Sequence, residues 1–253
     1  MPDRMTTSDR AAPATPSAWR WRLRGVVPGV VAAVVVSVGV SALALVVQER
    51  VGALAALDES VIRAATDVTR AHPGLRSALL VWEAAFQPLN VYVVATAVCL
   101  LAWWRGGLRA RAIWAFVTMM VAWNLALDLK LVVARARPVV ADPVSSAPGY
   151  SFPSGHVANA AAAATVLVIL LWPLLSRRSR PYAVGVAAVV VVLTALDRVY
   201  LGVHYPSDTI AGVLVGCGIA VASVLGYRGW RRDRPATPPP SGIPVSTPTR
   251  NEA

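Results

Sequence analysis

Residues 25–47 read GVVPGVVAAVVVSVGVSALALVV, a run without Asp, Glu, Lys or Arg. A helix needs about 20 predominantly apolar residues to cross a bilayer, so this run predicts a membrane-spanning helix. The composition agrees, because the 253-residue chain is 56% hydrophobic and only 15% charged, against about 25% charged residues in soluble globular proteins. These values exclude an ordinary soluble protein and a generally disordered chain, and they indicate a polytopic membrane protein.

Further apolar stretches follow along the chain, at 87–104, 112–133, 156–175, 182–200 and 206–227. With the first run they give six predicted spans. The two ends of the chain are rich in Pro, Ser, Thr and charged residues, a composition typical of disorder. We therefore expect an all-α membrane bundle of six transmembrane helices over residues 20–230, between disordered cytoplasmic tails over 1–19 and 231–253.

A segment of mixed character, residues 49–76, separates the first span from the second. Its apolar residues recur at helical spacing, and its charged residues Asp58, Glu59 and Arg63 lie on the opposite face of that predicted helix. This pattern favours an amphipathic helix that lies at the membrane interface.

Arginines gather in the loops on one side of the six spans: Arg20, Arg22, Arg24, Arg105, Arg109, Arg111, Arg177, Arg178, Arg180, Arg228, Arg231, Arg232 and Arg234. Short cytoplasmic loops carry an excess of basic residues, so we expect that side and both termini to be cytoplasmic. Segments 49–76, 134–155 and 202–205 would then face outward from the cell membrane. Most of the net charge of +11 is explained in this way, and we expect no nucleic-acid partner.

Residues 42–44 (Ala-Leu-Ala) resemble a signal-peptidase site. A signal peptide has an apolar region of about 7–15 residues, shorter than the run that precedes and includes this site. We therefore expect the first span to be retained; its removal would leave five spans with the same sidedness.

Charged residues on the outward side fall into three clusters. The first is Lys130 to Pro138, in which Lys130 and Arg137 are seven residues apart, two turns along one face of a helix. Lys130 is the only lysine of the chain, which suggests a position where a compact point charge is required.

The second cluster, Ser151 to His156, directly precedes the fourth span. Its proline, serine and glycine predict a helix N-terminus with unpaired backbone N–H groups, an arrangement that binds anions. We expect Ser154 and Gly155 to offer donors there, and His156 to project from the first turn.

The third cluster, Asp197 to Asp208, joins the fifth and sixth spans. His204 and Asp208 stand four residues apart, so the carboxylate can fix the tautomer of the imidazole and leave its other nitrogen free to attack. Arg198 adds a cation. Each residue alone could be an anchor or a helix cap, but together the clusters suit phosphoryl transfer without a metal. A zinc site fits less well, because three nearby cations would oppose a divalent ion.

The three clusters resemble the signature of the type-2 phosphatidic acid phosphatase superfamily, which is K-x6-R-P, then P-S-G-H, then S-R-x5-H-x3-D. Lys130, Arg137 and Pro138 match the first part, Pro153 to His156 the second, and Arg198, His204 and Asp208 the third. The motifs cover about 80 residues of a six-span chain, and the first span and the tails add only topology.

The resemblance implies a role for each matching residue. His204 would attack phosphorus and form a phosphohistidine, Asp208 would orient it, and His156 would protonate the leaving oxygen and then activate water. Lys130, Arg137, Ser154, Gly155 and Arg198 would bind the phosphate. One position departs from the pattern, because Asp197 replaces the serine before Arg198; an acid there could weaken phosphate binding or hold Arg198.

The expected function is a cofactor-free, metal-independent lipid phosphatase at the outer face of the membrane. Three substrate types stay open: polyprenyl diphosphate, phosphatidic acid or its diphosphate, and phosphatidylglycerophosphate. The alternatives are transfer of the phosphate to an acceptor alcohol at the same site, and a non-enzymatic anion or lipid transporter. Vanadate-dependent haloperoxidases have the same residue pattern but are soluble proteins. The oligomeric state is not indicated by the sequence.

Overall fold

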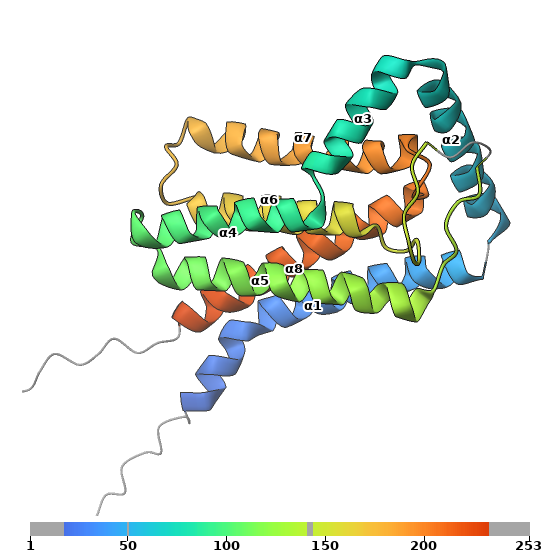
Figure 1. The fold of residues 1–253 in the computed structure, drawn as a ribbon. Helices are drawn as coiled ribbons and strands as arrows, with labels where there is room; N and C mark the ends of the chain where they lie inside the picture. Colours follow the sequence, from blue (N-terminus) through green and yellow to red (C-terminus); the bar gives the residue numbers. More distant parts are fainter. Residues whose placement is uncertain (1–17, 50, 141–143, 233–253) are drawn as a thin grey trace, which may run out of the picture.

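The computed structural model describes residues 18–49, 51–140 and 144–232, and every helix or strand assigned within these ranges is an α-helix. The helices are α1 (Ala18–Gln48), α2 (Gly52–Ala71), α3 (Pro73–Ala85), α4 (Pro88–Trp104), α5 (Arg109–Val133), α6 (Gly155–Leu171), α7 (Ser179–Tyr200) and α8 (Pro206–Arg232) (Figure 1). The all-α prediction is confirmed for these residues. The predicted tails fall outside the described residues, except that 18–19 and 231–232 belong to α1 and α8.

Each of the six predicted spans is helical, but the helices differ in length. Four are long and apolar enough to cross a membrane, over Val26–Gln48, Arg109–Val133, Ser179–Tyr200 and Pro206–Tyr227. A fifth span arises if α3 and α4, which are bent by 53° at their junction, are taken as one. The apolar helix α6 is shorter than predicted and ends at Leu171. Trp172 still has a right-handed helical conformation, but Pro173 has no backbone N–H with which to continue the helical hydrogen bonds.

Helix α6 lies at the centre of the bundle, with α4, α5, α7 and α8 packed around it (Figure 1). Its alanine-rich face is buried from Val157 to Ala163. Glycines on α8 allow that close approach: a Cβ atom on Gly212 would lie 2.8 Å from the carbonyl oxygen of Ser154, and one on Gly216 would overlap the carbonyl oxygen of Ala158. This packing fixes the N-terminus of α6 against the first turn of α8.

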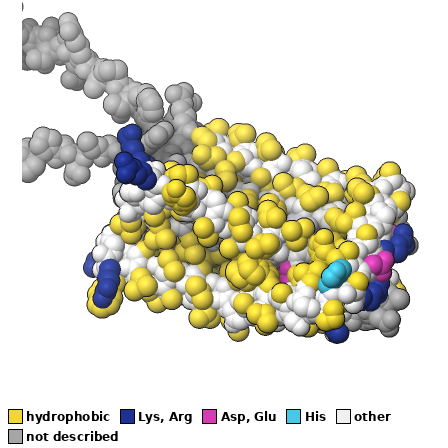
Figure 2. Space-filling view, turned by 90° about the horizontal axis from the view of Figure 1, so that it is seen from above, with side chains coloured by type: hydrophobic (Ala, Val, Ile, Leu, Met, Phe, Trp, Pro, Cys, Tyr) yellow, Lys and Arg dark blue, Asp and Glu magenta, His cyan; other side chains and the backbone are white. Residues whose placement is uncertain are grey.

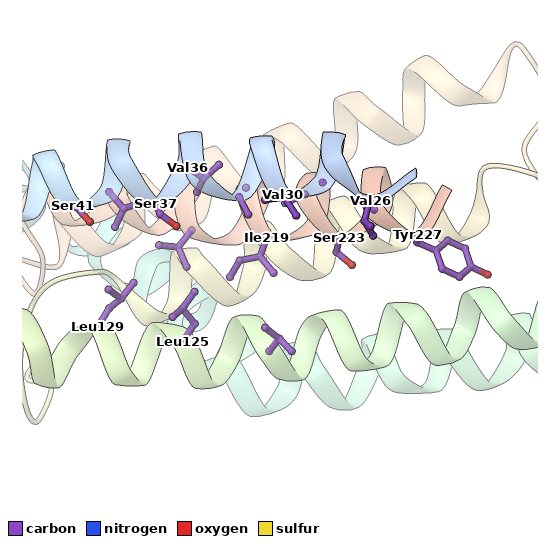
Figure 3. A pocket seen from close by; sticks show the side chains of 18 residues that line it. Val26, Val30, Val36, Ser37, Ser41, Leu125, Leu129, Ile219, Ser223 and Tyr227 are labelled. Carbon is purple, nitrogen blue, oxygen red and sulfur yellow. The ribbon is translucent and has the colours of Figure 1, made fainter. Parts of the chain in front are cut away.

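Helix α1 packs along α8 on the outside of this core. A Cβ atom on Gly29 would lie 2.7 Å from the backbone nitrogen of Gly226, so the two helices touch through their backbones. Between α1, α5 and α8 remains an apolar cavity of about 560 Å³, lined in part by Val30, Leu125 and Ile219 (Figure 3). None of the predicted site residues lines this cavity.

The structure of residues 49–76 differs from the single interfacial helix that was predicted. Residues 49–76 do not form one amphipathic helix, because the chain breaks at His72 and Pro73 into α2 and α3. Helix α2 is amphipathic, but Asp58 lies on its buried face and is only 1% exposed. A buried carboxylate requires a partner, so α2 is joined to the rest of the bundle by more than apolar contacts.

Hydrophobic side chains cover the flank of the bundle, whereas Lys and Arg side chains gather at its two ends (Figure 2). One of these ends carries the loops between α4 and α5 and between α6 and α7. The other carries α2, the segment after α5 and the turn between α7 and α8 (Figure 1). The three charged clusters of the sequence all lie at this second end.

Candidate active site

Lys130 and Arg137 extend into the site from different elements: Lys130 lies on α5, and Arg137 lies in the loop that follows it. Helix α5 ends at Val133, and Ala134 takes a left-handed conformation with φ of 49°. The prediction that Lys130 and Arg137 share one helical face is therefore wrong, because the chain turns away before Arg137. The two side chains nevertheless converge: Lys130 Nζ donates to the carbonyl of Tyr150 at 2.8 Å, and Arg137 Nε donates to the carbonyl of Gly149 at 3.1 Å.

His204 and Asp208 meet as the sequence predicts. Asp208 Oδ2 lies 3.6 Å from His204 Nδ1, and both side chains are buried. Arg137 Nη1 lies 3.2 Å from His204 Nε2. A guanidinium can only donate, so Nε2 is the acceptor and the neutral imidazole carries its proton on Nδ1, facing Asp208.

The protonation state of His204 follows from its burial. Burial lowers the pKa of His204 to about 4, with the positive charges of Lys130 and Arg137 adding to this effect and Asp208 opposing it. The imidazole is therefore neutral at neutral pH, with a lone pair on Nε2.

The first turn of α6 presents unpaired polar atoms beside these groups. Among the described residues, Ser154 Oγ and His156 Nε2 are buried and have no hydrogen-bond partner. A Cβ atom built on Gly155 would lie 3.5 Å from Lys130 Cε, so the lysine passes close to this backbone. The charges of Lys130, Arg137 and Arg198 all act on His156. Buried polar atoms without partners are uncommon, and here they accompany the free amide ends of a helix N-terminus.

Arg198 is held by two carboxylates. Its Nε donates to Asp197 Oδ2 at 2.8 Å, and its Nη1 donates to Glu83 Oε1 on α3, also at 2.8 Å. Arg198 and Asp197 are each 1% exposed. Asp197, which stands in place of the family serine, therefore does bind Arg198.

The cations around the two histidines divide into two kinds. Arg198 pairs with Asp197 and Glu83, and a further arginine, Arg135, pairs with Asp58 and Asp208. Lys130 and Arg137 make hydrogen bonds to backbone carbonyls, and neither forms an ion pair with a carboxylate of the described residues. These are the two cations whose charge is available to an anion.

Four residues of this site were not predicted: Asp58, Glu83, Arg135 and Ser151. Arg135 falls at an unspecified position of the first motif, and Ser151 precedes the second. Ser151 Oγ donates to Asp208 Oδ2, and Ser151 N donates to the carbonyl of Arg135 at 2.8 Å. Asp58 and Glu83 lie outside the three motifs, on helices that carry other charged residues, and no pattern in the sequence sets them apart.

Comparison with known families agrees with this geometry. The family model described as the PAP2 superfamily matches residues 111–232. The chain is therefore similar to the PAP2 superfamily over these residues, which we call the PAP2 domain. It begins in α5, ends in α8 and contains all three charged clusters.

Relatives of the PAP2 domain include named phosphatases. Phosphatidylglycerophosphatase B of Bacillus subtilis is 38% identical over 91 residues, covering 35% of this chain and 44% of the relative. Decaprenylphosphoryl-5-phosphoribose phosphatase of Mycobacterium tuberculosis is 36% identical over 119 residues, covering 45% and 61%. The matches thus span about half the length of these two relatives.

A solved structure extends the likeness beyond the PAP2 domain. The crystal structure of a transmembrane PAP2-type phosphatidylglycerolphosphate phosphatase from Bacillus subtilis superposes with a TM-score of 0.66. The two chains are 25% identical, and the match covers 76% of this chain and 94% of the other. Together with the apolar helices, this likeness indicates that the chain is a multi-pass membrane protein.

Proposed function

We propose that this protein is a metal-independent phosphatase of the cell membrane that removes a terminal phosphate from a lipid phosphate or diphosphate. The observation that carries the proposal is the pairing of His204 with Asp208 beside two cations, Lys130 and Arg137, that have no carboxylate partner among the described residues. A neutral imidazole with one nitrogen directed at a carboxylate is a suitable nucleophile. Unpaired cations suit the charge of a phosphate.

The reaction follows from the placement of these groups. The negative charge of the bound phosphate favours the protonated form of His156. His204 Nε2 attacks phosphorus, the bond between phosphorus and the lipid oxygen breaks, and the His156 imidazolium gives that oxygen its proton. Water then attacks the phosphohistidine and gives a proton to His156, which releases inorganic phosphate and restores both imidazoles. Asp208 stabilises the charged His204 ring during the first step.

Phosphate binding is assigned to the groups around these imidazoles. Lys130 and Arg137 carry the charge, and the Ser154 hydroxyl and the Gly155 N–H at the start of α6 donate to the non-bridging oxygens. Arg137 Nη1 now lies against His204 Nε2, so it would turn toward the phosphate when that nitrogen attacks. Arg198 contributes less, because Asp197 and Glu83 offset its positive charge.

A lipid substrate is supported by the apolar flank of the bundle and by the names of the relatives, which include phosphatases of phosphatidylglycerophosphate and of decaprenylphosphoryl-5-phosphoribose. A lipid tail can stay in the bilayer while its phosphate reaches the charged end. In this proposal all six predicted spans cross the membrane, α2 lies at the interface, both termini are cytoplasmic and the site faces outward. The basic loops at the opposite end support that orientation.

The test is phosphate release by the detergent-purified protein from a panel of phosphatidic acid, polyprenyl diphosphate and phosphatidylglycerophosphate, with excess chelator present. We expect turnover of at least one lipid under these conditions. His204→Ala should reduce it to background, because the nucleophile is lost, and His156→Ala should lower kcat by about 10²- to 10⁴-fold, as for loss of a general acid.

His72→Ala is the matched control, since His72 is an exposed histidine in the break between α2 and α3. It should leave turnover unchanged. Loss of activity on chelation would contradict the metal-free mechanism, and turnover by His204→Ala would contradict the assignment of the nucleophile.

A further inference from the structure

Arg135 connects helix α2 to helix α8 through two ion pairs. Its Nη2 donates to Asp58 Oδ2 on α2 at 2.8 Å, and its Nη1 donates to Asp208 Oδ1 on α8 at 2.6 Å. The ring of Tyr205 covers the guanidinium, with 4.2 Å between the guanidinium carbon and the ring centroid. The left-handed turn at Ala134 brings Arg135 to this position directly after α5 ends.

The two oxygens of Asp208 have different partners. Oδ2 faces His204 Nδ1 and accepts from the hydroxyl of Ser151 and from the backbone N–H of Tyr205, the latter at 2.9 Å. Oδ1 accepts from Arg135. Because each oxygen is held from a different side, the carboxylate cannot rotate without breaking the bond to Arg135. Arg135 therefore controls which edge of Asp208 the imidazole meets.

Asp58 completes this arrangement from the far side. It is 1% exposed, accepts from the backbone N–H of Ser207 at 3.1 Å, and also accepts from the Ser207 hydroxyl. Arg135 lies between Asp58 and Asp208, whose side chains are 1% and 0% exposed. Burial would lower the pKa of Arg135, but Asp208 and Asp58 together raise it. A buried carboxylate left without its partner is costly, so the three groups depend on one another.

We infer that Arg135 and Asp58 are positioning residues: Asp58 holds Arg135, and Arg135 orients the Asp208 carboxylate toward His204. This inference rests on the proposed function and assigns to α2 a part in the reaction, outside the PAP2 domain at 111–232. Neither residue touches the phosphate. Each acts through Asp208, so their loss should slow the chemical step more than it weakens substrate binding.

The test compares kcat, KM and the pH profile of kcat/KM in the parent protein, Arg135→Gln and Asp58→Asn, on a lipid that the parent hydrolyses. We expect kcat to fall by about 10- to 100-fold in Arg135→Gln, the range for losing a group that orients a functional side chain, with KM changed less than threefold.

The acidic limb of the pH profile should also move. Asp208 on α8, Lys130 on α5 and Arg137 in the following loop act on His204, and His156 on α6, which interacts with both His204 and Arg198 on α7, belongs to the same cluster. Removing the positive charge of Arg135 leaves the negative charge of Asp208 uncompensated beside the imidazole. The pKa of His204 should therefore rise, so that His204 becomes protonated at a higher pH. Asp58→Asn should reduce kcat several-fold without this upward movement, because Arg135 keeps its charge.

Arg63→Gln is the matched control, since Arg63 is an exposed arginine of α2 that pairs with Glu59 at 3.4 Å. It should leave kcat and the pH profile unchanged. If the parent hydrolyses no lipid phosphate, the proposed function fails. If the parent is active and folded Arg135→Gln keeps kcat within twofold, the positioning role is overturned. Should Arg135→Gln not fold, the same criterion applies to Asp58→Asn, judged by a monodisperse elution profile.

Discussion

Arg198 lies between Asp197 and Glu83, and this pairing would limit how strongly it binds phosphate in the proposed function. Each carboxylate offers an acceptor at 2.8 Å, so the guanidinium meets an incoming anion with its charge already compensated. Asp197 Oδ1 is buried and has no hydrogen-bond partner among the described residues. Asp197 thus restrains Arg198 and is itself incompletely satisfied.

The first prediction concerns Asp197→Ser, which restores the residue type of the family pattern. Glu83 still holds Arg198 in this variant, but one opposing charge is gone. We expect KM for the lipid phosphate to fall about fivefold, since about 1 kcal/mol corresponds to that factor. Steady-state kinetics on the purified variant measure it.

Asp67→Ser provides the comparison, because Asp67 is a 70% exposed aspartate on α2. Its KM should equal that of the parent. A KM for Asp197→Ser that is unchanged or higher would mean that Asp197 does not limit phosphate binding.

The motif residues could be predicted because their spacing is fixed by the resemblance. The four-residue spacing also predicted that His204 meets Asp208, although His204 lies in the turn before α8 and not on that helix. Arg135 could not be predicted in the same way. Its partner Asp58 lies 77 residues earlier in the chain, on a helix whose charged residues looked like a solvated face. A contact between two distant segments leaves no periodic signal in either of them.

At the scale of the helices, the position of the site depends on how α6 meets α8. The backbone N–H of Ser154 donates to the carbonyl of Asp208 at 3.0 Å, so the first turns of the two helices are joined directly. Gly212 and Gly216 remove the side chains that would separate them. The proposed catalytic pair at the start of α8 and the proposed phosphate-binding turn at the start of α6 are thereby held together.

The second prediction concerns this contact. Gly216→Ala places a methyl group against the carbonyl of Ala158 and the Cβ atom of Ala161, and overpacking of this kind costs about 1–3 kcal/mol. We expect a lower Tm in detergent and a lower kcat, because the two helix starts move apart. Thermal unfolding followed by circular dichroism measures the stability.

Gly185→Ala on α7 is the control, because a Cβ atom there would meet nothing within 4 Å. It should keep the Tm or raise it, since alanine favours a helix more than glycine does. Equal Tm values for the two variants would show that the α6–α8 contact can adjust without cost.

The apolar runs predicted helices at all six positions, because a long run of Val, Ala and Leu admits few other structures in a bilayer. The ends of the helices were predicted less accurately: α6 stops at Leu171, four residues before the predicted end at 175. The division of 49–76 into α2 and α3 was missed, although Pro73 is a natural first residue of a helix. Amphipathic spacing alone gave no reason to place a break there.

For the whole molecule, the distribution of charge gives an orientation. Figure 2 shows an apolar flank between two charged ends. Among the described residues, the buried carboxylate–arginine pairs and the histidines of the site lie at one of these ends. The other carries arginine-rich loops. In the proposed topology these loops face the cytoplasm and the site faces outward.

The third prediction tests this orientation by cysteine labelling in intact cells. Ser146→Cys lies in the exposed segment between α5 and α6, and Ser176→Cys lies in the exposed loop between α6 and α7. A membrane-impermeant maleimide should label the first from outside and the second only after permeabilisation.

Labelling of the parent protein measures the background from its own thiols, of which Cys99 is buried and Cys217 is half-buried. Labelling of Ser176→Cys in intact cells, with protection of Ser146→Cys, would reverse the orientation and place the reaction on the cytoplasmic side.

The contact between α1 and α8 has a consequence for biogenesis. The ribosome makes α1 long before α8, yet the two helices touch through Gly29 and Gly226, so α1 enters the bilayer without its main partner. Contacts between distant segments form late. The bundle therefore closes only when α8 has been inserted, and a chain that stops before Pro206 leaves the side of α1 that carries Gly29 without its partner.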